Sequence, residues 1–133
     1  MTKKQIKNFR DLLVYQDSYD AMLLVIREII PQLPYCERYD LKQQLSRSSK
    51  AIPRLIAEGY AKRHQKAGFQ KYLYDALAES NETIVSLEQC KDIYKVNPEL
   101  VKKLITIYDI TSRRIYNLGK AWNNFKLSKP INH

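Results

Sequence analysis

The sequence predicts an all-α fold, an antiparallel up-down-up-down bundle of four helices formed by residues 11–126. Apolar residues recur at helical spacing over four long segments, and no segment shows the alternation of a strand. The connections between these segments are short, which favours antiparallel neighbours in a bundle. Only three of the 133 residues are glycine, fewer than a β-rich or disordered chain usually contains.

The first helix is expected at residues 11–30, with Asn8 or Asp11 as its N-cap. Pro31 and Pro34 follow the periodic segment, and proline does not continue a helix. The predicted inner stripe of this helix is Leu12, Tyr15, Tyr19, Met22, Ile26 and Ile29.

The second helix is expected at residues 40–58, with Asp40 as its N-cap. Pro53 should kink it, because proline removes a backbone donor and clashes with the preceding turn. Gly59 is expected to end it by adopting the left-handed conformation. The predicted inner stripe is Leu41, Leu45, Ser48, Ile52 and either Leu55 or Ile56.

The third and fourth helices are expected at residues 67–95 and 98–125. Asn97, Pro98 and Glu99 form a start signal, with a capping side chain, a proline at the first position and an acid in the first turn. The inner stripe of the third helix is Phe69, Leu73, Ala76, Ser80, Thr83 or Ile84, Leu87, Cys90 and Tyr94. That of the fourth is Val101, Leu104, Tyr108, Thr111, Ile115, Leu118, Trp122 and Phe125.

The chain ends and the surplus apolar residues predict features outside the core. Residues 1–10 form a basic N-terminal arm, and residues 127–133 form a flexible tail. Several apolar residues lie off the inner stripes and either widen the core or favour a homo-oligomer through a second seam. They are Leu13, Val14, Leu24, Val25, Leu100, Ile107 and Ile110.

The charge predicts a polyanionic partner. Lysine and arginine total 23 against 14 acidic residues, a formal net charge of +9. Residues 50–71 hold six basic side chains and one acidic one, whereas residues 72–97 hold two basic and five acidic. Such a polarised surface is typical of nucleic-acid binding, although the charges could also serve only to solvate the helices. No apolar run is long enough to span a membrane, and a cytoplasmic protein is expected.

The sequence offers no chemistry for catalysis. Its two histidines, His64 and His133, lie outside the helices, so the di-metal centre of helical bundles cannot form. Cys36 and Cys90 have no base near them in sequence and are expected to be inert. Glu58 has no acid, histidine or thiol beside it and reads as a buried structural residue. We therefore expect no enzyme activity, no cofactor and no metal.

Two rows of opposite charge predict a ladder between the second and third helices. The acidic row, spaced i, i+4, i+7, is Asp75, Glu79 and Glu82, and the basic row is Arg47, Lys50 and Arg54. With the two helices antiparallel, Arg47 lies level with Glu79. These three cations are therefore expected to be partly neutralised within the fold.

The remaining cations are the predicted nucleic-acid contacts. Three lie in the connection between the second and third helices and three on the fourth helix: Lys62, Arg63, Lys66, Arg113, Arg114 and Lys120. They would bind phosphates without reading sequence. Tyr60, Tyr72 and Tyr116 lie near them and could stack on bases.

Two motifs resemble the 23S rRNA intervening-sequence family of four-helix-bundle proteins. One is F-R-D-L-L-V-Y-Q at Phe9–Gln16, and the other is A-I-P-R-L-I-A-E-G-Y at Ala51–Tyr60, preceded by Gln44-Leu45 and Arg47. The chain departs from the family pattern at Ala51, where serine is usual, and at Leu55, where asparagine is usual. Further matches on the third helix are Phe69, Leu73, Ala76 and Glu82.

This resemblance implies a homo-oligomer, a pentameric barrel, without catalytic activity. Similar proteins include accessory subunits of diversity-generating retroelements, which work with a reverse transcriptase and its RNA. Two functions stay open on the sequence: direct binding of RNA or DNA through repeated basic patches, and a protein-interaction scaffold or reverse-transcriptase accessory subunit that binds no nucleic acid specifically. A small-molecule carrier with a pocket near Pro53 is a third, weaker alternative.

Overall fold

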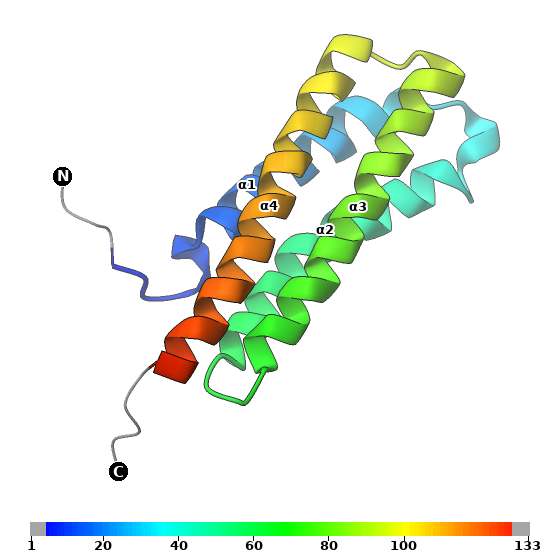
Figure 1. The fold of residues 1–133 in the computed structure, drawn as a ribbon. Helices are drawn as coiled ribbons and strands as arrows, with labels where there is room; N and C mark the ends of the chain where they lie inside the picture. Colours follow the sequence, from blue (N-terminus) through cyan, green and yellow to red (C-terminus); the bar gives the residue numbers. More distant parts are fainter. Residues whose placement is uncertain (1–4, 129–133) are drawn as a thin grey trace.

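The computed structural model describes residues 5–128 of the chain, and side chains as far as Trp122. Within these residues it contains no strand and four α-helices: α1 (Leu13–Leu24), α2 (Leu41–Ala61), α3 (Gly68–Tyr94) and α4 (Pro98–Ser128). They pack side by side as a helical bundle (Figure 1), which confirms the predicted all-α class. Residues 1–4 of the predicted arm and 129–133 of the predicted tail lie outside the described part.

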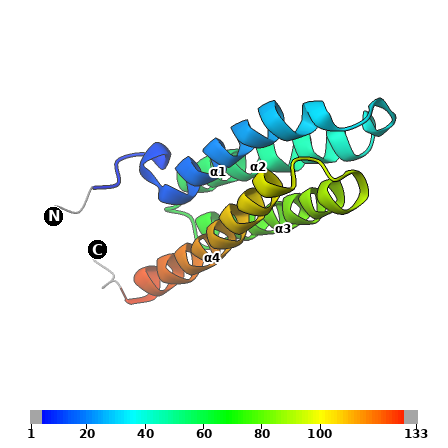
Figure 2. The ribbon, with the colours of Figure 1, turned by 90° about the horizontal axis from the view of Figure 1, so that it is seen from above.

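Each helix packs on two of the other three. The pairs in contact are α1 with α2, α2 with α3, α3 with α4, and α1 with α4. Figure 2 shows α1 beside α2 on one side of the bundle and α3 beside α4 on the other. In Figure 1, the last turns of α4 lie at the same end of the bundle as the connection between α2 and α3. No helix in the described range is both long and apolar enough to cross a membrane.

The first predicted helix is a composite of several helical segments. A short 3-10 turn, Phe9–Asp11, comes first and is closed by a capping box between Asn8 and Asp11. After α1 the chain continues through a π-helical turn, Val25–Ile29, and a 3-10 turn, Ile30–Gln32. Asn8 and Asp11 therefore act together, as caps of the turn that precedes α1 and not of α1 itself.

The predicted inner stripe of α1 is largely wrong. The side chain of Tyr19 is 41% exposed, and those of Tyr15 and Met22 are only half buried. The small residues Ser18 and Ala21 take the inward positions, because they let the helix lie close to its neighbours while the larger tyrosines remain at the rim. The buried residues of α1 and its π turn are Val14, Ser18, Ala21, Val25 and Ile29.

Gly59 has a different role from the one that the sequence predicts. α2 continues through Pro53 and Gly59 to Ala61, and no glycine has a positive φ. A Cβ atom at Gly59 would lie only 2.6 Å from the Cβ of Tyr72 and 3.1 Å from Cδ1 of Phe69. Glycine is needed here because α2 and α3 approach closely, and not because α2 ends.

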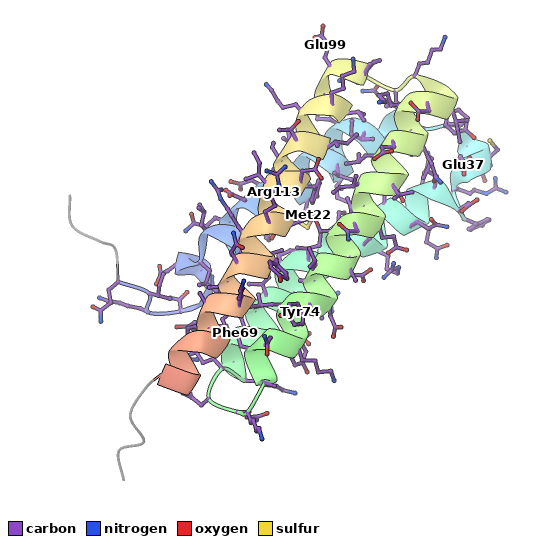
Figure 3. All side chains as sticks on the ribbon, in the orientation of Figure 1. Met22, Glu37, Phe69, Tyr74, Glu99 and Arg113 are labelled. Atoms are coloured by element: carbon purple, nitrogen blue, oxygen red, sulfur yellow. The ribbon has the colours of Figure 1, made fainter. Side chains whose placement is uncertain are left out.

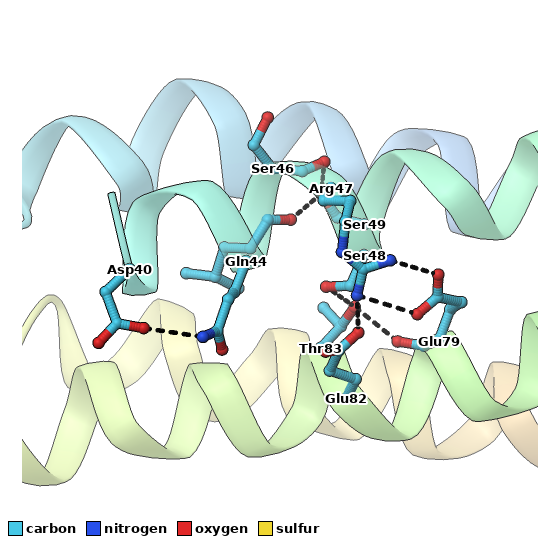
Figure 4. Close-up of polar contacts among 10 residues, drawn as sticks. Asp40, Gln44, Ser46, Arg47, Ser48, Ser49, Glu79, Glu82 and Thr83 are labelled. Carbon is cyan, nitrogen blue, oxygen red and sulfur yellow. Dashed lines mark hydrogen bonds and ion pairs between the residues drawn. The ribbon is translucent and has the colours of Figure 1, made fainter. Parts of the chain in front are cut away.

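The start of α2 also differs from the prediction. The Asp40 carboxylate makes no capping bond to the backbone and instead accepts a hydrogen bond of 2.7 Å from the Gln44 side chain (Figure 4). The carboxylate of Glu37 takes the capping role, because its Oε1 accepts a bond of 3.2 Å from the backbone N–H of Leu41. A glutamate four residues before the helix therefore supplies the anion at its N-terminus.

The bounds of α3 agree with the prediction, whereas α4 continues to Ser128, three residues past its predicted end and into the predicted tail. The predicted stripes of both helices are largely buried, with Tyr94, Leu118 and Trp122 half buried. Asn97 Oδ1 accepts from the backbone N–H of Leu100 at 3.4 Å, and Pro98 opens α4 as expected. In α2, Ile56 and not Leu55 completes the buried stripe. Phe125 lies beyond the described side chains. The buried positions that the sequence predicted in these two helices are Phe69, Leu73, Ala76, Ser80, Thr83, Ile84, Leu87, Cys90, Val101, Leu104, Tyr108, Thr111 and Ile115.

Hydroxyl groups pair across the helices inside this apolar core. The Ser48 and Thr83 hydroxyl oxygens are 2.8 Å apart and join α2 to α3, and those of Ser80 and Ser112 are 2.7 Å apart and join α3 to α4. Each pair satisfies polar atoms that water cannot reach. Among the described side chains, only the Tyr108 hydroxyl is buried without a hydrogen-bond partner. Burial raises the pKa of Tyr108, so its hydroxyl stays protonated.

Gly59→Ala should destabilise the protein. The added methyl group has no room against Tyr72 and Phe69, and overpacking of this kind costs about 1–3 kcal/mol. Gly119→Ala is the matched control, because its Cβ would meet Leu73 and Tyr74 at 3.6 and 3.7 Å, ordinary contact distances. Higher helix propensity should then raise stability by about 0.5–1 kcal/mol. Urea unfolding measures both, and equal effects of the two substitutions would contradict the close approach at Gly59.

Tyr108→Phe should stabilise the protein by about 1 kcal/mol, because it removes a buried hydroxyl without a partner. Tyr116→Phe is the control: its side chain is 46% exposed, so the change should stay within about 0.5 kcal/mol. Urea unfolding again gives the free energies. A clear loss of stability in Tyr108→Phe would mean that the hydroxyl forms a hydrogen bond in solution.

Candidate nucleic-acid interface

Three of the predicted cations gather in the connection between α2 and α3. We call Lys62, Arg63 and Lys66 the basic turn. The connection is tight, since Ala67 has a left-handed φ of 56° and a Cβ at Gly68 would lie 2.4 Å from the Lys62 carbonyl oxygen. Lys62 and Lys66 are exposed and Arg63 is half buried. None of the three forms an ion pair with a described residue, so their charge is available to a partner.

Aromatic residues hold two of these cations in place. Lys62 Nζ is 2.9 Å from the Tyr72 hydroxyl oxygen, and this hydrogen bond raises the pKa of Lys62 and keeps it charged. The Arg63 guanidinium lies 4.1 Å from the Tyr60 ring centroid and donates to the Tyr60 carbonyl at 2.9 Å. The carbonyl of Arg63 accepts from Trp122 Nε1 at 3.4 Å, which ties the end of α4 to the basic turn.

The structure separates the three predicted cations of α4. Arg114 Nη1 forms an ion pair with Asp17 of α1 at 2.9 Å and is therefore partly neutralised within the fold. Arg113, labelled in Figure 3, is exposed and forms no ion pair among the described residues. Lys120 is exposed too and follows Arg113 by seven residues, which places both on one helix face. Of the two adjacent arginines, only Arg114 forms an ion pair among the described residues.

The predicted charge ladder forms at one rung. Figure 4 shows Arg47 of α2 reaching Glu79 and Glu82 of α3, with 2.7 Å between Arg47 Nη1 and Glu79 Oε2. Partial burial raises the pKa of Glu79, but the hydrogen bond from Arg47 and its charge outweigh this effect and leave the pKa below its usual value. Lys50 and Arg54, the other two cations of the row, form no ion pair with a described residue. The prediction that acidic residues of α3 partly neutralise Lys50 and Arg54 is therefore wrong.

Among the described side chains, the other residues considered for catalysis or metal binding are exposed, except for the buried thiol of Cys90. Glu58 is exposed, so its prediction as a buried residue is wrong, because it lies on the outer face of α2. His64 is exposed in the connection, as expected. Cys36 is exposed, whereas Cys90 is buried, and burial raises the pKa of the Cys90 thiol to about 11. Within the described range, no three histidine, cysteine or acidic residues come together as a potential metal site.

The fold and this surface define a class of helical-bundle proteins that carry a basic connection at one end. The chain belongs to the 23S rRNA-intervening sequence protein family, whose model matches residues 10–117. This match confirms the resemblance of the two sequence motifs. Neither a curated protein nor a solved structure matches the chain significantly.

The Arg47–Glu79 pair predicts a pH dependence. Because the folded state lowers the pKa of Glu79, its contribution to stability is present above the ordinary glutamate pKa and is lost as the pH falls through the lowered value. Glu79→Gln should cost about 0.5 kcal/mol near neutral pH, since the Arg47 side chain is half exposed, and the cost should vanish in acid. Urea unfolding across pH tests this, with exposed Glu88→Gln as control. An equal cost at every pH would contradict the assignment.

Proposed function

We propose that this protein is a non-enzymatic, cytoplasmic homo-oligomer that binds RNA or DNA through basic patches repeated around the assembly. The observation that carries this proposal is the basic turn, where Lys62, Arg63 and Lys66 gather without an ion-pair partner among the described residues. Arg113 and Lys120 extend the surface along α4, and Arg114 contributes less because Asp17 neutralises it. Phosphates are the natural ligands of such a surface.

Composition and family membership support the same proposal. The chain carries a formal net charge of +9, and its excess is concentrated in segments that include the basic turn. The description of the family refers to a sequence within 23S ribosomal RNA. Contacts of this kind bind the phosphate backbone without reading bases, so RNA and DNA are both candidate ligands.

The proposal includes an up-down-up-down course of the helices. Two contacts support it for α2 and α3: Tyr94 at the end of α3 donates a hydrogen bond to Glu37, just before α2, and Gly59 near the end of α2 packs on Phe69 at the beginning of α3. A kink at Pro53 in α2 belongs to the same proposal.

Assembly into a pentamer is also proposed, and exposed apolar side chains support an oligomer. Val85 and Ile93 of α3 are 53% and 62% exposed, and Leu13 of α1 is 50% exposed. Val85 and Ile93 lie eight residues apart on one face of α3, and apolar side chains that gather on one face can be covered by another chain. Five copies of the basic turn would multiply the local positive field and the affinity for a long polyanion.

The same exposed residues favour one alternative function, a protein-interaction scaffold. In that case Val85 and Ile93 would contact a different protein, such as the reverse transcriptase of a retroelement, and the chain would reach nucleic acid only through that partner. The isolated chain would then bind neither RNA nor DNA.

Replacing the basic turn by Lys62→Gln, Arg63→Gln and Lys66→Gln together should weaken binding to structured RNA and duplex DNA. Losing three phosphate contacts makes the negative slope of log affinity against log salt shallower by about 2–3 for duplex DNA. Fluorescence anisotropy across a salt series gives both quantities, and size-exclusion chromatography checks assembly.

The matched control removes the same charge at the opposite end of the bundle, with Arg27→Gln, Lys95→Gln and Lys102→Gln, all exposed. Equal losses in the two triple variants would show that only net charge matters. Unchanged binding in the basic-turn variant would refute the site, and no binding by the folded wild-type protein would favour the scaffold.

A further inference from the structure

A groove between α1 and α2 is the strongest feature that the proposed function does not use. Its volume is about 340 Å³, at the small end of ligand pockets in proteins. Figure 2 shows the two helices running side by side along one side of the bundle. One apolar and aromatic wall faces two cations, and the lining residues are Phe9, Tyr15, Tyr19, Met22, Lys50, Pro53, Arg54 and Ala57.

Three aromatic rings follow one another along the groove. The ring centroids of Phe9 and Tyr15 are 4.9 Å apart, and those of Tyr15 and Tyr19 are 5.8 Å apart. Tyr19 is 41% exposed, and the other two are half buried. The sequence predicts both tyrosines in the core, but Ser18 and Ala21 occupy the inward positions. The tyrosine rings are therefore available at the surface. A row of accessible rings is a stacking platform for flat ligands.

The opposite wall carries two cations. Lys50 and Arg54 lie one helical turn apart on α2, are exposed, and form no ion pair with a described residue. No acidic residue lines the groove. At its other end, the guanidinium of Arg10 lies 4.5 Å from the Phe9 ring centroid. The ligand that fits must therefore be both anionic and flat.

We propose that this groove binds an unpaired stretch of nucleic acid, with bases stacked on Tyr15 and Tyr19 and phosphates held by Lys50 and Arg54. Bases of a duplex are stacked inside the helix and cannot reach the rings, so the groove selects single-stranded segments. The inference rests on the proposed function and deepens it, because it names the form of nucleic acid that is recognised.

The groove and the basic turn are separate sites. The groove lies on the α1 side of α2, whereas Lys62 bonds to Tyr72 of α3. Exposed Glu58 lies between Arg54 and Lys62, one helical turn from each. The groove and the basic turn can therefore be tested by separate substitutions.

The test compares two groove variants on two probes. The first variant is Tyr15→Leu with Tyr19→Leu, which removes the rings and keeps apolar bulk, and the second is Lys50→Gln with Arg54→Gln. The probes are an unstructured RNA of about twelve nucleotides, within the usual site sizes for single strands, and a duplex of the same sequence. Fluorescence anisotropy of the full chain measures both. The tyrosine variant should bind the single strand about a hundredfold more weakly, since it removes two rings and stacking of each base contributes a factor of about ten. It should bind the duplex as the wild type does.

Matched controls separate the groove from general effects. Tyr35→Leu with Tyr39→Leu removes two rings that are 73% and 78% exposed and lie outside the groove. Arg27→Gln with Lys95→Gln removes two exposed charges far from it. Should circular dichroism show that the double tyrosine variant is unfolded, Tyr19→Leu alone carries the test, because its ring is the most exposed of the three.

Each outcome decides between the two proposals. A selective loss of single-strand binding in the groove variants supports the groove, whatever the basic-turn variant does. Equal losses on both probes, or unchanged binding while the basic-turn variant is weakened, overturn the groove and leave the proposed function standing. A decaglutamate peptide bound as tightly as the RNA would instead show a site for acidic protein segments and overturn the inference. A folded wild-type protein that binds neither nucleic acid overturns both proposals.

Discussion

The close approach of α2 and α3 at Gly59 is the constraint on which the candidate interface depends. With no side chain at this position, Phe69 and Tyr72 pack directly on the α2 backbone. Tyr72 is then placed to bind Lys62, and Phe69 packs edge to face on Trp122 with 5.1 Å between their ring centroids. The same few residues thus fix the end of α2, the beginning of α3 and the last described turns of α4. A looser contact would leave the basic turn without the aromatic residues that position it.

The middle of the bundle is fixed by different means. Small polar residues replace large apolar ones there, and their hydroxyl groups bond in pairs, Ser48 to Thr83 and Ser80 to Ser112. Short side chains allow close packing, and a hydroxyl pair penalises any sliding of one helix along another, because a shifted helix would leave buried polar atoms unpaired. The Arg47 ion pair adds a contact at the surface beside the Ser48–Thr83 pair, as Figure 4 shows.

The sequence predicted those helices whose apolar residues are large and regularly spaced, and it failed where small residues carry the packing. Leu104 and Ile115 identify the inner face of α4 by periodicity alone, and the structure buries both. In α1, apolar residues surround the whole helix, so periodicity selected Tyr19 over Ser18. The prediction for Gly59 failed for a related reason. A glycine that ends a helix and a glycine that lets a neighbouring helix approach closely look alike in sequence.

For the candidate site, the sequence predicted only that cations are present in excess, and not which of them form ion pairs within the fold. Sequence spacing can place a cation level with an acid, as it did for Arg47 and Glu79, but it cannot decide which of several cations forms the pair. Arg114 and Arg113 are neighbours in sequence, yet only Arg114 reaches an acid, Asp17, on another helix. The candidates for binding a partner are therefore the cations without an ion pair among the described residues.

This criterion links the basic turn to the groove. Among the described residues, Lys62, Lys66, Lys50 and Arg54 lack ion pairs. Tyrosine rings of neighbouring helices lie beside three of them: Tyr72 of α3 beside Lys62, and Tyr15 and Tyr19 of α1 across the groove from Lys50 and Arg54. A surface that served only to keep the protein in solution would not need cations and accessible rings side by side. A single strand of nucleic acid fits this combination, since cations bind its phosphates and aromatic rings stack on its unpaired bases.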